Sequence, residues 1–478
     1  MQSFPNYVDG EWIESREHTP NINPSDLSDV IGHYPSADAE TVQAATAAAR
    51  AALPGWSHSN IQQRADLLER VAAGILARQD ELAELMAREE GKTLQEAAAE
   101  VLRSAQTFRY FAGEALRIRG EKLDSVRPGL DVEITREPVG VVGIITPWNI
   151  PMAIPAWKIA PALAYGNCVV FKPADLVPAS AWELARLLHE AGIPRGVFNL
   201  VAGKGSVVGE AMLSSPHIDA ISFTGSVATG RHVAACAVAT NKKVQMEMGG
   251  KNPLVVLDDA DLEVAVNAAI NGAFFATGQR CTASSRLVVT EDIHDRFVTA
   301  LRERMETLVV DHALKPETQI GPVVDQRQLE QNLEYLQIGQ DEGARLTGGG
   351  RLRRDTEGHY FAPALFTETT NAMRINREEI FGPITAVIRV RDYDEALHVA
   401  NDTQFGLSSG ICTRSLKYAN HFKRHSSAGL VMVNLPTGGV DYHVPFGGRK
   451  GSSYGPREQG HYAIDFYTDV KTAYSAYE

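Results

Sequence analysis

Hydrophobic and polar positions divide the chain into helical, extended and alternating parts. Asp38 to Gly120 carries long Ala, Leu, Glu and Arg runs, which favour helices broken at Leu53-Pro54-Gly55 and near Gly91. Residues 131–136 alternate polar and apolar side chains, which is typical of a half-exposed strand. We expect this strand to form an arm that pairs with another subunit, or with the strand-like run from Ala463 to Ala473.

From residue 139 onward, buried strand-like runs alternate with helical segments. The predicted strands are 139–146, 168–171, 197–201, 218–223 and 243–246. Strands that alternate with crossover helices predict a parallel, doubly wound sheet, so the fold class is α/β. A further α/β unit extends from about 254 to 440, with predicted strands at 254–257, 287–290 and 384–390.

Ligands of such sheets bind at the carboxyl ends of the strands. Each predicted strand is followed there by a polar or glycine-rich element: Pro147-Trp148-Asn149, Lys172-Pro173-Ala174-Asp175, Gly203 to Gly209, Thr224-Gly225-Ser226 and Glu247 to Lys251. The series predicts a ligand-binding face. The two glycine patterns, Gly203 to Gly209 and Thr224-Gly225-Ser226, are weak evidence by themselves. Neither is a GxGxxG motif, and each fits a plain turn equally well.

Cys281 lies in a run of small and polar residues between a helical segment and a strand-like one. Backbone N–H groups at such a junction favour a thiolate and can stabilise a developing oxyanion. The alternative for an isolated cysteine is a buried structural thiol.

Composition narrows the function classes. A chain of 478 residues predicts two or three domains, and its net charge of −13 argues against nonspecific binding to nucleic acid or to an anionic membrane. The 4 cysteines are scattered and the 14 histidines lack ligand spacing, so we expect neither a disulfide framework nor a metal site. No signal peptide or membrane-spanning run is visible, which leaves a cytoplasmic location as the default expectation.

Motifs along nearly the whole chain, in family order, resemble the NAD(P)-dependent aldehyde dehydrogenase superfamily. They are Pro147-Trp148-Asn149, Lys172 to Asp175, Phe223 to Ser226 with Gly230, Glu247 to Lys251, Gly278 to Cys281, Glu379 to Pro383 and Pro445 to Gly448. The resemblance implies a Rossmann-like parallel-sheet cofactor domain (1–120 and 139–250), an α/β catalytic domain (251–440) and a β-arm oligomerisation domain (121–138 and 461–478). It also implies a homodimer or homotetramer.

The resemblance further implies the catalytic roles. Cys281 would attack the aldehyde, Asn149 and the Cys281 N–H would hold the oxyanion, and Glu247 would activate the water that hydrolyses the thioester. Lys172 belongs to both the catalytic and the cofactor sets. Glu247 could instead be a surface charge at a strand end, and Asn149 could serve as a helix N-cap.

For the cofactor, NAD or NADP, the resemblance assigns Lys172 and Asp175 to the adenosine ribose, Ser226 to the pyrophosphate, and Glu379 with Phe381 to the nicotinamide ribose. The other expected cofactor residues are Ile145, Thr146, Pro147, Trp148, Gly205, Gly209, Phe223, Thr224 and Gly225. Asp175 is shorter than the glutamate that the family often carries, which weakens its repulsion of a 2′-phosphate. We therefore expect NAD and leave NADP open.

Trp157, Arg280, Thr282 and Phe446 are the expected substrate residues. Arg280 could lower the Cys281 pKa, pair with a substrate carboxylate, or point outward. Residues 279–283 and 445–460 resemble those of the 2-oxoglutarate-semialdehyde (2,5-dioxopentanoate) dehydrogenases of bacterial sugar-acid catabolism. Succinate semialdehyde, glutarate semialdehyde or a broad range of aldehydes stay open as substrates, as does a thiol esterase activity. Trp157 stands where succinate-semialdehyde enzymes often carry arginine.

Overall fold

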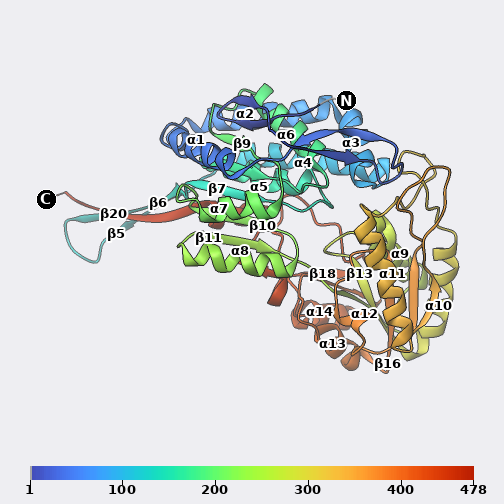
Figure 1. Cartoon of the computed structure of the whole chain (residues 1–478). Coiled ribbons are helices and arrows are strands. Elements are labelled where there is room, and N and C mark those ends of the chain that lie inside the picture. The colour runs from blue at the N-terminus through green and yellow to red at the C-terminus, as the bar shows by residue number, and fades with distance from the viewer. Residues whose placement is uncertain (1–2, 478) are drawn as a thin grey trace.

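An eight-stranded sheet forms one half of the computed structural model, which describes residues 3–477 (Figure 1). The sheet order is β19-β11-β10-β7-β8-β9-β1-β2, and the central strands β11, β10, β7, β8 and β9 run parallel, as predicted. The strands are β1 (Asn6–Val8), β2 (Glu11–Ile13), β7 (Val141–Ile145), β8 (Cys168–Lys172), β9 (Phe198–Leu200), β10 (Ala220–Thr224), β11 (Lys243–Glu247) and β19 (Ser453–Tyr454).

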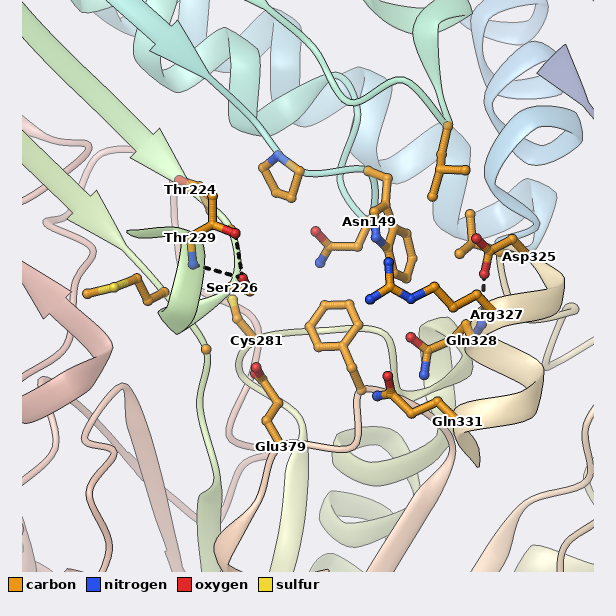
Figure 2. Close-up of a pocket in the computed structure, with 18 of the residues that line it drawn as sticks. Asn149, Thr224, Ser226, Thr229, Cys281, Asp325, Arg327, Gln328, Gln331 and Glu379 are labelled. Atoms are coloured by element: carbon orange, nitrogen blue, oxygen red, sulfur yellow. Dashed lines mark hydrogen bonds between the residues drawn. The ribbon is translucent and has the colours of Figure 1, made fainter. Parts of the chain in front are cut away.

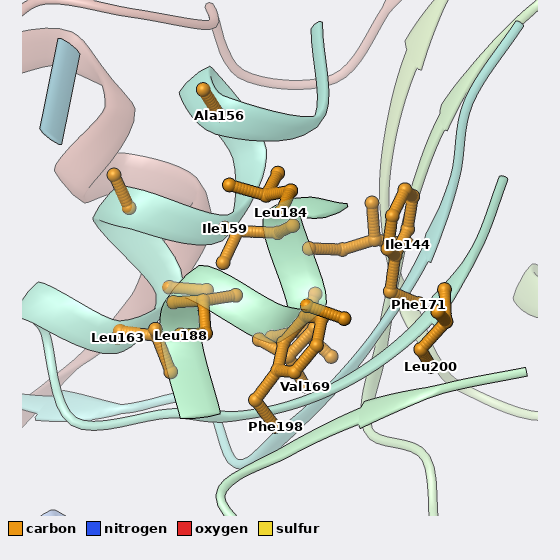
Figure 3. Packing of buried hydrophobic residues seen from close by; sticks show 14 of the residues in the cluster. Ile144, Ala156, Ile159, Leu163, Val169, Phe171, Leu184, Leu188, Phe198 and Leu200 are labelled. Atoms are coloured by element: carbon orange, nitrogen blue, oxygen red, sulfur yellow. The ribbon is translucent and has the colours of Figure 1, made fainter. Parts of the chain in front are cut away.

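Helices cover this sheet and supply its core. They are α1 (Ala39–Ser57), α2 (Ile61–Ala77), α3 (Gln79–Glu90), α4 (Leu94–Ala115), α5 (Ala153–Ala164), α6 (Pro178–Glu190), α7 (Glu210–Ser214) and α8 (Val227–Ala239). Phe171 and Leu200 project from the strands toward the apolar faces of α5 and α6, where Ile159 and Leu188 are fully buried (Figure 3). This packing fixes the strand ends from which the predicted site residues emerge.

The predicted helix break at Leu53-Pro54-Gly55 is wrong, because α1 continues through Pro54 to Ser57. Pro54 lies in the last turn, and the burial of Trp56 beyond it stabilises the continued helix. The break near Gly91 is confirmed. Gly91 ends α3 with φ of 91°, a left-handed conformation that glycine adopts without strain.

A seven-stranded sheet, in the order β14-β15-β16-β13-β12-β17-β18, forms the other half. Its strands are β12 (Asn252–Val256), β13 (Ser284–Thr290), β14 (Arg345–Gly348), β15 (Ala364–Thr369), β16 (Ile384–Val390), β17 (Ser408–Cys412) and β18 (Leu430–Val433). The covering helices are α9 (Leu262–Phe274), α10 (Glu291–Glu306), α11 (Gln326–Asp341), α12 (Arg374–Arg377), α13 (Tyr393–Asn401) and α14 (Leu416–His425). The α/β fold class is confirmed in both halves.

An antiparallel ribbon projects from the body (Figure 1). It consists of β5 (Glu121–Asp124), β6 (Leu130–Pro138) and β20 (Thr468–Ala476), and β6 pairs with β20 along its whole length, as predicted. The final strand begins at Thr468 rather than Ala463, because Ile464–Tyr467 form the short helix α15 and Phe466 is buried in the main core.

A separate two-stranded sheet joins β3 (His18–Ile22) and β4 (Val30–Pro35). Within residues 3–477, no helix combines the length and the apolar character needed to cross a membrane.

Candidate active site

A cavity of about 500 Å³ opens between the two halves of the molecule (Figure 2). Its walls combine the ends of β7, β10 and β11 with segments of the second half, and residues that line it include Pro147, Trp148, Asn149, Thr224, Gly225, Ser226, Cys281, Glu379 and Phe381. We call it the Cys281 cavity. The structure thus brings the Cys281 thiol from one half against the strand ends of the other.

The segment before Cys281 is strained. Ala276, Thr277 and Gly278 have φ of 51°, 55° and 64°, and two of these left-handed residues carry a Cβ. A Cβ on Gly278 would lie 2.2 Å from the Gly382 carbonyl oxygen, so the backbones of residues 278 and 382 pack too closely for any side chain. This turn reverses the chain after α9 and presents Cys281 to the cavity.

Asn252 holds the loop that carries Cys281 in place. Its Nδ2 donates to the carbonyl oxygens of Cys281 at 2.8 Å and Ala283 at 2.9 Å. Asn252 follows the Gly249-Gly250-Lys251 motif, but its role was not predicted. An asparagine at the start of a strand gives no sign of a contact that forms only when β12 and β13 pair.

Burial opposes the predicted stabilisation of a Cys281 thiolate by backbone N–H groups. Burial, and to a smaller extent the charges of Glu379 and Glu247, raise the pKa of the Cys281 thiol to about 12. The backbone N–H groups of Cys281 and Thr282 lower the pKa, as expected, but burial outweighs them. The thiol is therefore protonated at neutral pH.

Asn149 lies just after β7 with 5% of its surface exposed. Its Nδ2 donates to the Gln279 carbonyl oxygen at 2.8 Å, which leaves the second N–H of the amide available to the cavity. The helix N-cap alternative is wrong, because Met152 is the N-cap of α5 and no side chain caps it.

A buried ion pair supports the loop that carries Asn149. Lys92 Nζ donates to Glu100 Oε2 at 2.5 Å and to the Asn149 carbonyl oxygen at 2.8 Å. Glu100 Oε1 accepts from the backbone N–H of Met152 at 2.9 Å. Neither charge was predicted to matter, because charged residues in a helical pattern ordinarily face solvent.

Glu247 ends β11 and is only 3% exposed, so the alternative of a surface charge is wrong. Its Oε2 accepts from Ser453 Oγ at 2.6 Å. Burial raises the pKa of Glu247 well above its ordinary value, and the nearby charge of Glu458 raises it further. Glu458 forms an ion pair with the fully buried Lys158. Glu247 is near enough to Cys281 for its charge to raise the thiol pKa, but it does not line the Cys281 cavity.

The expected cofactor residues fall into two groups. Pro147, Trp148, Thr224, Gly225, Ser226, Glu379 and Phe381 line the cavity, whereas Ile145, Thr146, Lys172, Asp175, Gly205, Gly209 and Phe223 do not. Ser226 caps α8 by accepting from the Thr229 N–H (Figure 2). Thr224 Oγ1 is buried and has no hydrogen-bond partner among residues 3–477.

Lys172 and Asp175 lie beside the cavity rather than on its lining. Lys172 is buried and its Nζ donates to the Pro173 carbonyl oxygen at 2.6 Å, while burial lowers the pKa of Lys172. Asp175 is exposed. Gly205 and Gly209 bound a short π-helical turn, and a Cβ on either would meet no atom within 4 Å.

The expected substrate residues also lie outside the lining. The rings of Trp157 and Phe446 stack with centroids 5.5 Å apart. Arg280 donates through Nη2 to the carbonyl oxygens of Asn271 and Gly272, and the Thr282 carbonyl oxygen accepts from Thr437 Oγ1 at 2.6 Å. Their contact with a substrate stays a prediction.

Comparison with known proteins agrees with the site. The aldehyde dehydrogenase family model matches residues 12–473. An alpha-ketoglutarate semialdehyde dehydrogenase of Haloferax volcanii is 44% identical, over 99% of each chain. An alpha-ketoglutaric semialdehyde dehydrogenase of Bacillus subtilis is 42% identical, over 99% of this chain and 98% of the relative.

A solved structure shares the fold. It is a betaine aldehyde dehydrogenase of Staphylococcus aureus in complex with NAD+, with a TM-score of 0.96 and 35% identity over 99% of this chain and 94% of that one. The predicted oxidoreductase class and the expectation of a nicotinamide cofactor agree with these matches. From the length of the match and the identity of its relatives, the chain belongs to the aldehyde dehydrogenase family.

Proposed function

We propose that the chain oxidises 2-oxoglutarate semialdehyde to 2-oxoglutarate, with NAD or NADP as the hydride acceptor. The observation that carries the proposal is the grouping of a cavity-lining thiol, a free amide N–H and a buried carboxylate of raised pKa, on Cys281, Asn149 and Glu247. Relatives with that substrate in their names, at 42% and 44% identity, support the choice of aldehyde.

The reaction begins with a proton transfer. A thiol of pKa about 12 must lose its proton before the sulfur can attack the aldehyde carbon. Burial raises the pKa of the Glu247 carboxyl as well, which makes its carboxylate a stronger base, and Glu247 can accept the proton. The oxyanion that forms then meets the second N–H of the Asn149 amide and the Cys281 backbone N–H.

The cavity residues fit a dinucleotide. Thr224 Oγ1 is a buried hydroxyl without a partner, and Ser226 opens a 13-residue helix whose N-terminal dipole favours a phosphate. Open space around Gly205 and Gly209 leaves room for a ligand to approach the backbone. A bound nicotinamide would supply the hydride acceptor for this reaction.

Glu247 also completes the cycle. The thioester left on Cys281 needs a water molecule from which a base removes a proton, and the carboxylate form of Glu247 supplies that base. Ser453, which donates to Glu247 Oε2, fixes the carboxylate orientation. A coenzyme A-acylating reaction would not require this carboxylate.

The antiparallel ribbon supports a homodimer or homotetramer. Leu123, Val126, Val470 and Tyr474 expose apolar side chains along β5, its turn and β20. Side chains of this kind on a projecting sheet are suited to cover a second copy of the chain. Four unpaired cysteines among the described residues fit a reducing compartment such as the cytoplasm, and the aldehyde itself fits sugar-acid catabolism.

The test is the rate of reduced-cofactor formation with purified protein. Substrates would be the semialdehydes of 2-oxoglutarate, succinate and glutarate, and the neutral pentanal, each with NAD and with NADP. We expect the highest kcat/KM with 2-oxoglutarate semialdehyde. An equal or higher value with pentanal would leave an aldehyde dehydrogenase and refute the substrate.

A further inference from the structure

Arg103, on α4, is a cation without a counter-ion. It is partly buried, and no ion pair joins it to a carboxylate among the residues that the structure describes. Its polar contact is a donation from Nη2 to Gln459 Oε1 at 3.1 Å. Since guanidinium carries five N–H donors, most of its capacity is unused.

The carboxylates nearest to Arg103 do not neutralise it. Burial lowers the pKa of Arg103, whereas the distant charges of Asp441 and Glu100 raise it by less. Glu100 is already engaged with Lys92 and the start of α5. By contrast, the ion-paired Arg88 has a raised pKa because Asp29 accepts its hydrogen bonds.

Two further donors beside Arg103 lack acceptors. Gln459 is fully buried, and its Oε1 accepts from Arg103. The Nε2 of the same amide has no acceptor within residues 3–477. Trp157 is 6% exposed, its Nε1 has no acceptor in that range, and the Arg103 guanidinium carbon lies 6.0 Å from the centre of its ring. Unsatisfied buried donors are costly, so their grouping calls for an anion.

The cluster of Arg103, Gln459 and Trp157 is linked by packing to Glu247 and Cys281. Trp157 stacks on Phe446, and a Cβ on the adjacent Gly447 would lie 2.8 Å from Glu247 Oε1. Glu247 is close enough to Cys281 for its charge to raise the thiol pKa. The aromatic pair Trp157–Phe446 therefore connects Arg103 to the side of Cys281 where water and aldehyde must meet.

We propose that Arg103, together with the Gln459 and Trp157 N–H groups, binds the carboxylate of the semialdehyde substrate and sets the preference for anionic aldehydes. The inference rests on the proposed function and deepens it. Arg280 is a weaker candidate for this role, because its Nη2 already donates to two carbonyl oxygens at the end of α9. A guanidinium fork suits a carboxylate, and the aromatic surroundings strengthen the pairing.

The test compares Arg103→Gln and Arg103→Lys with the wild type on 2-oxoglutarate semialdehyde and on pentanal, which has the same number of carbons. For Arg103→Gln we expect kcat/KM for the semialdehyde to fall about 10- to 100-fold, mainly through KM, with pentanal changed less than about twofold. Arg103→Lys should restore part of the loss. Arg109→Gln, an exposed arginine of the same helix, is the matched control and should change neither substrate.

Inhibition by the product 2-oxoglutarate measures binding of the carboxylate independently of the rate of aldehyde oxidation. Its inhibition constant should rise in Arg103→Gln by the same factor as KM, and a thermal melt should confirm that the variant is folded. Equal losses on both aldehydes, or a retained preference for the semialdehyde, would overturn the role of Arg103 while leaving the proposed function intact. A wild type without preference for the anionic aldehyde would refute the proposed function itself, and Arg103 with it.

Discussion

Two regions meet at Cys281, and they are built in different ways. The Cys281 cavity is open and is formed by strand ends, with groups such as Thr224 and Ser226 facing it. The region behind it is packed, and helices α4 and α5 and residues 446–459 supply aromatic rings and buried charges. An open, donor-lined space suits a large cofactor, whereas packed aromatic rings and buried charges suit discrimination among small aldehydes. Variants should therefore separate effects common to all aldehydes from effects specific to one.

Cys281→Ala should abolish the oxidation of every aldehyde. Without the thiol, no covalent adduct forms, and we expect kcat to fall by at least about 10⁴-fold with every aldehyde. Cofactor binding, measured by quenching of tryptophan fluorescence, should persist because the cavity walls are intact. Cys236→Ala, on the helix α8, is the matched control and should keep full activity. Substantial turnover in Cys281→Ala would remove the residue from the nucleophile role.

Glu247→Gln changes a residue of the packed region and should slow the hydrolysis step while leaving the Cys281 cavity unchanged. We expect steady-state turnover to fall about 10²- to 10⁴-fold, while a burst of one reduced cofactor per site survives if the burst step can use another base. Glu379, whose pKa burial raises to about 7, lies in the cavity and is the available base. Rapid-mixing absorbance measures both phases. Unchanged steady-state turnover would refute the role of Glu247.

The pH profile sharpens this assignment. The base must be a carboxylate, and burial raises the pKa of Glu247. Wild-type turnover should therefore increase as the pH rises through that raised pKa and decrease below it. In Glu247→Gln this dependence of turnover on pH should disappear. If the same rise of turnover with pH persists in the variant, the titrating group is not Glu247.

The open region was the more predictable one. Its groups follow strands directly, so Asn149, Thr224 and Ser226 could be read from short contiguous motifs once the parallel sheet was recognised. Glu247 was read in the same way, although it lies outside the Cys281 cavity. The packed region depends on contacts between distant segments. Arg103 and Gln459 are 356 positions apart, and Arg103 belongs to no motif.

Burial explains the remaining errors. The raised pKa of Cys281 follows from its surroundings in the folded chain and leaves no mark on the local sequence. Lys92 and Glu100 look like the solvated face of a helix until α4 packs against α5. Pro54 was read as a helix breaker because the burial of Trp56 beyond it cannot be seen in the pattern.

Asp175→Asn should act through the open region and alter the choice of cofactor. The neutral side chain accepts a weaker hydrogen bond from a ribose hydroxyl and no longer repels a 2′-phosphate. We expect kcat/KM with NAD to fall roughly 10-fold and that with NADP to rise. The change should be equal for the semialdehyde and for pentanal. Asp66→Asn, an exposed residue of α2, is the control. An unchanged NADP to NAD ratio would contradict the ribose assignment.

Thr224→Val should give the smallest effect and the clearest contrast with Arg103. The substitution keeps the shape of the side chain but removes the Oγ1 hydroxyl, which is buried and lacks a partner among the described residues. If a bound cofactor satisfies this hydroxyl, its KM should rise about three- to tenfold, the value of one neutral hydrogen bond. The KM of both aldehydes should stay constant if, as we propose, they bind toward Arg103 rather than in the Cys281 cavity. Without a ligand contact, removal of an unsatisfied hydroxyl should instead raise the melting temperature of the cofactor-free protein and leave the cofactor KM unchanged. Thr240→Val, at the far end of α8, controls for the loss of a hydroxyl away from the cavity.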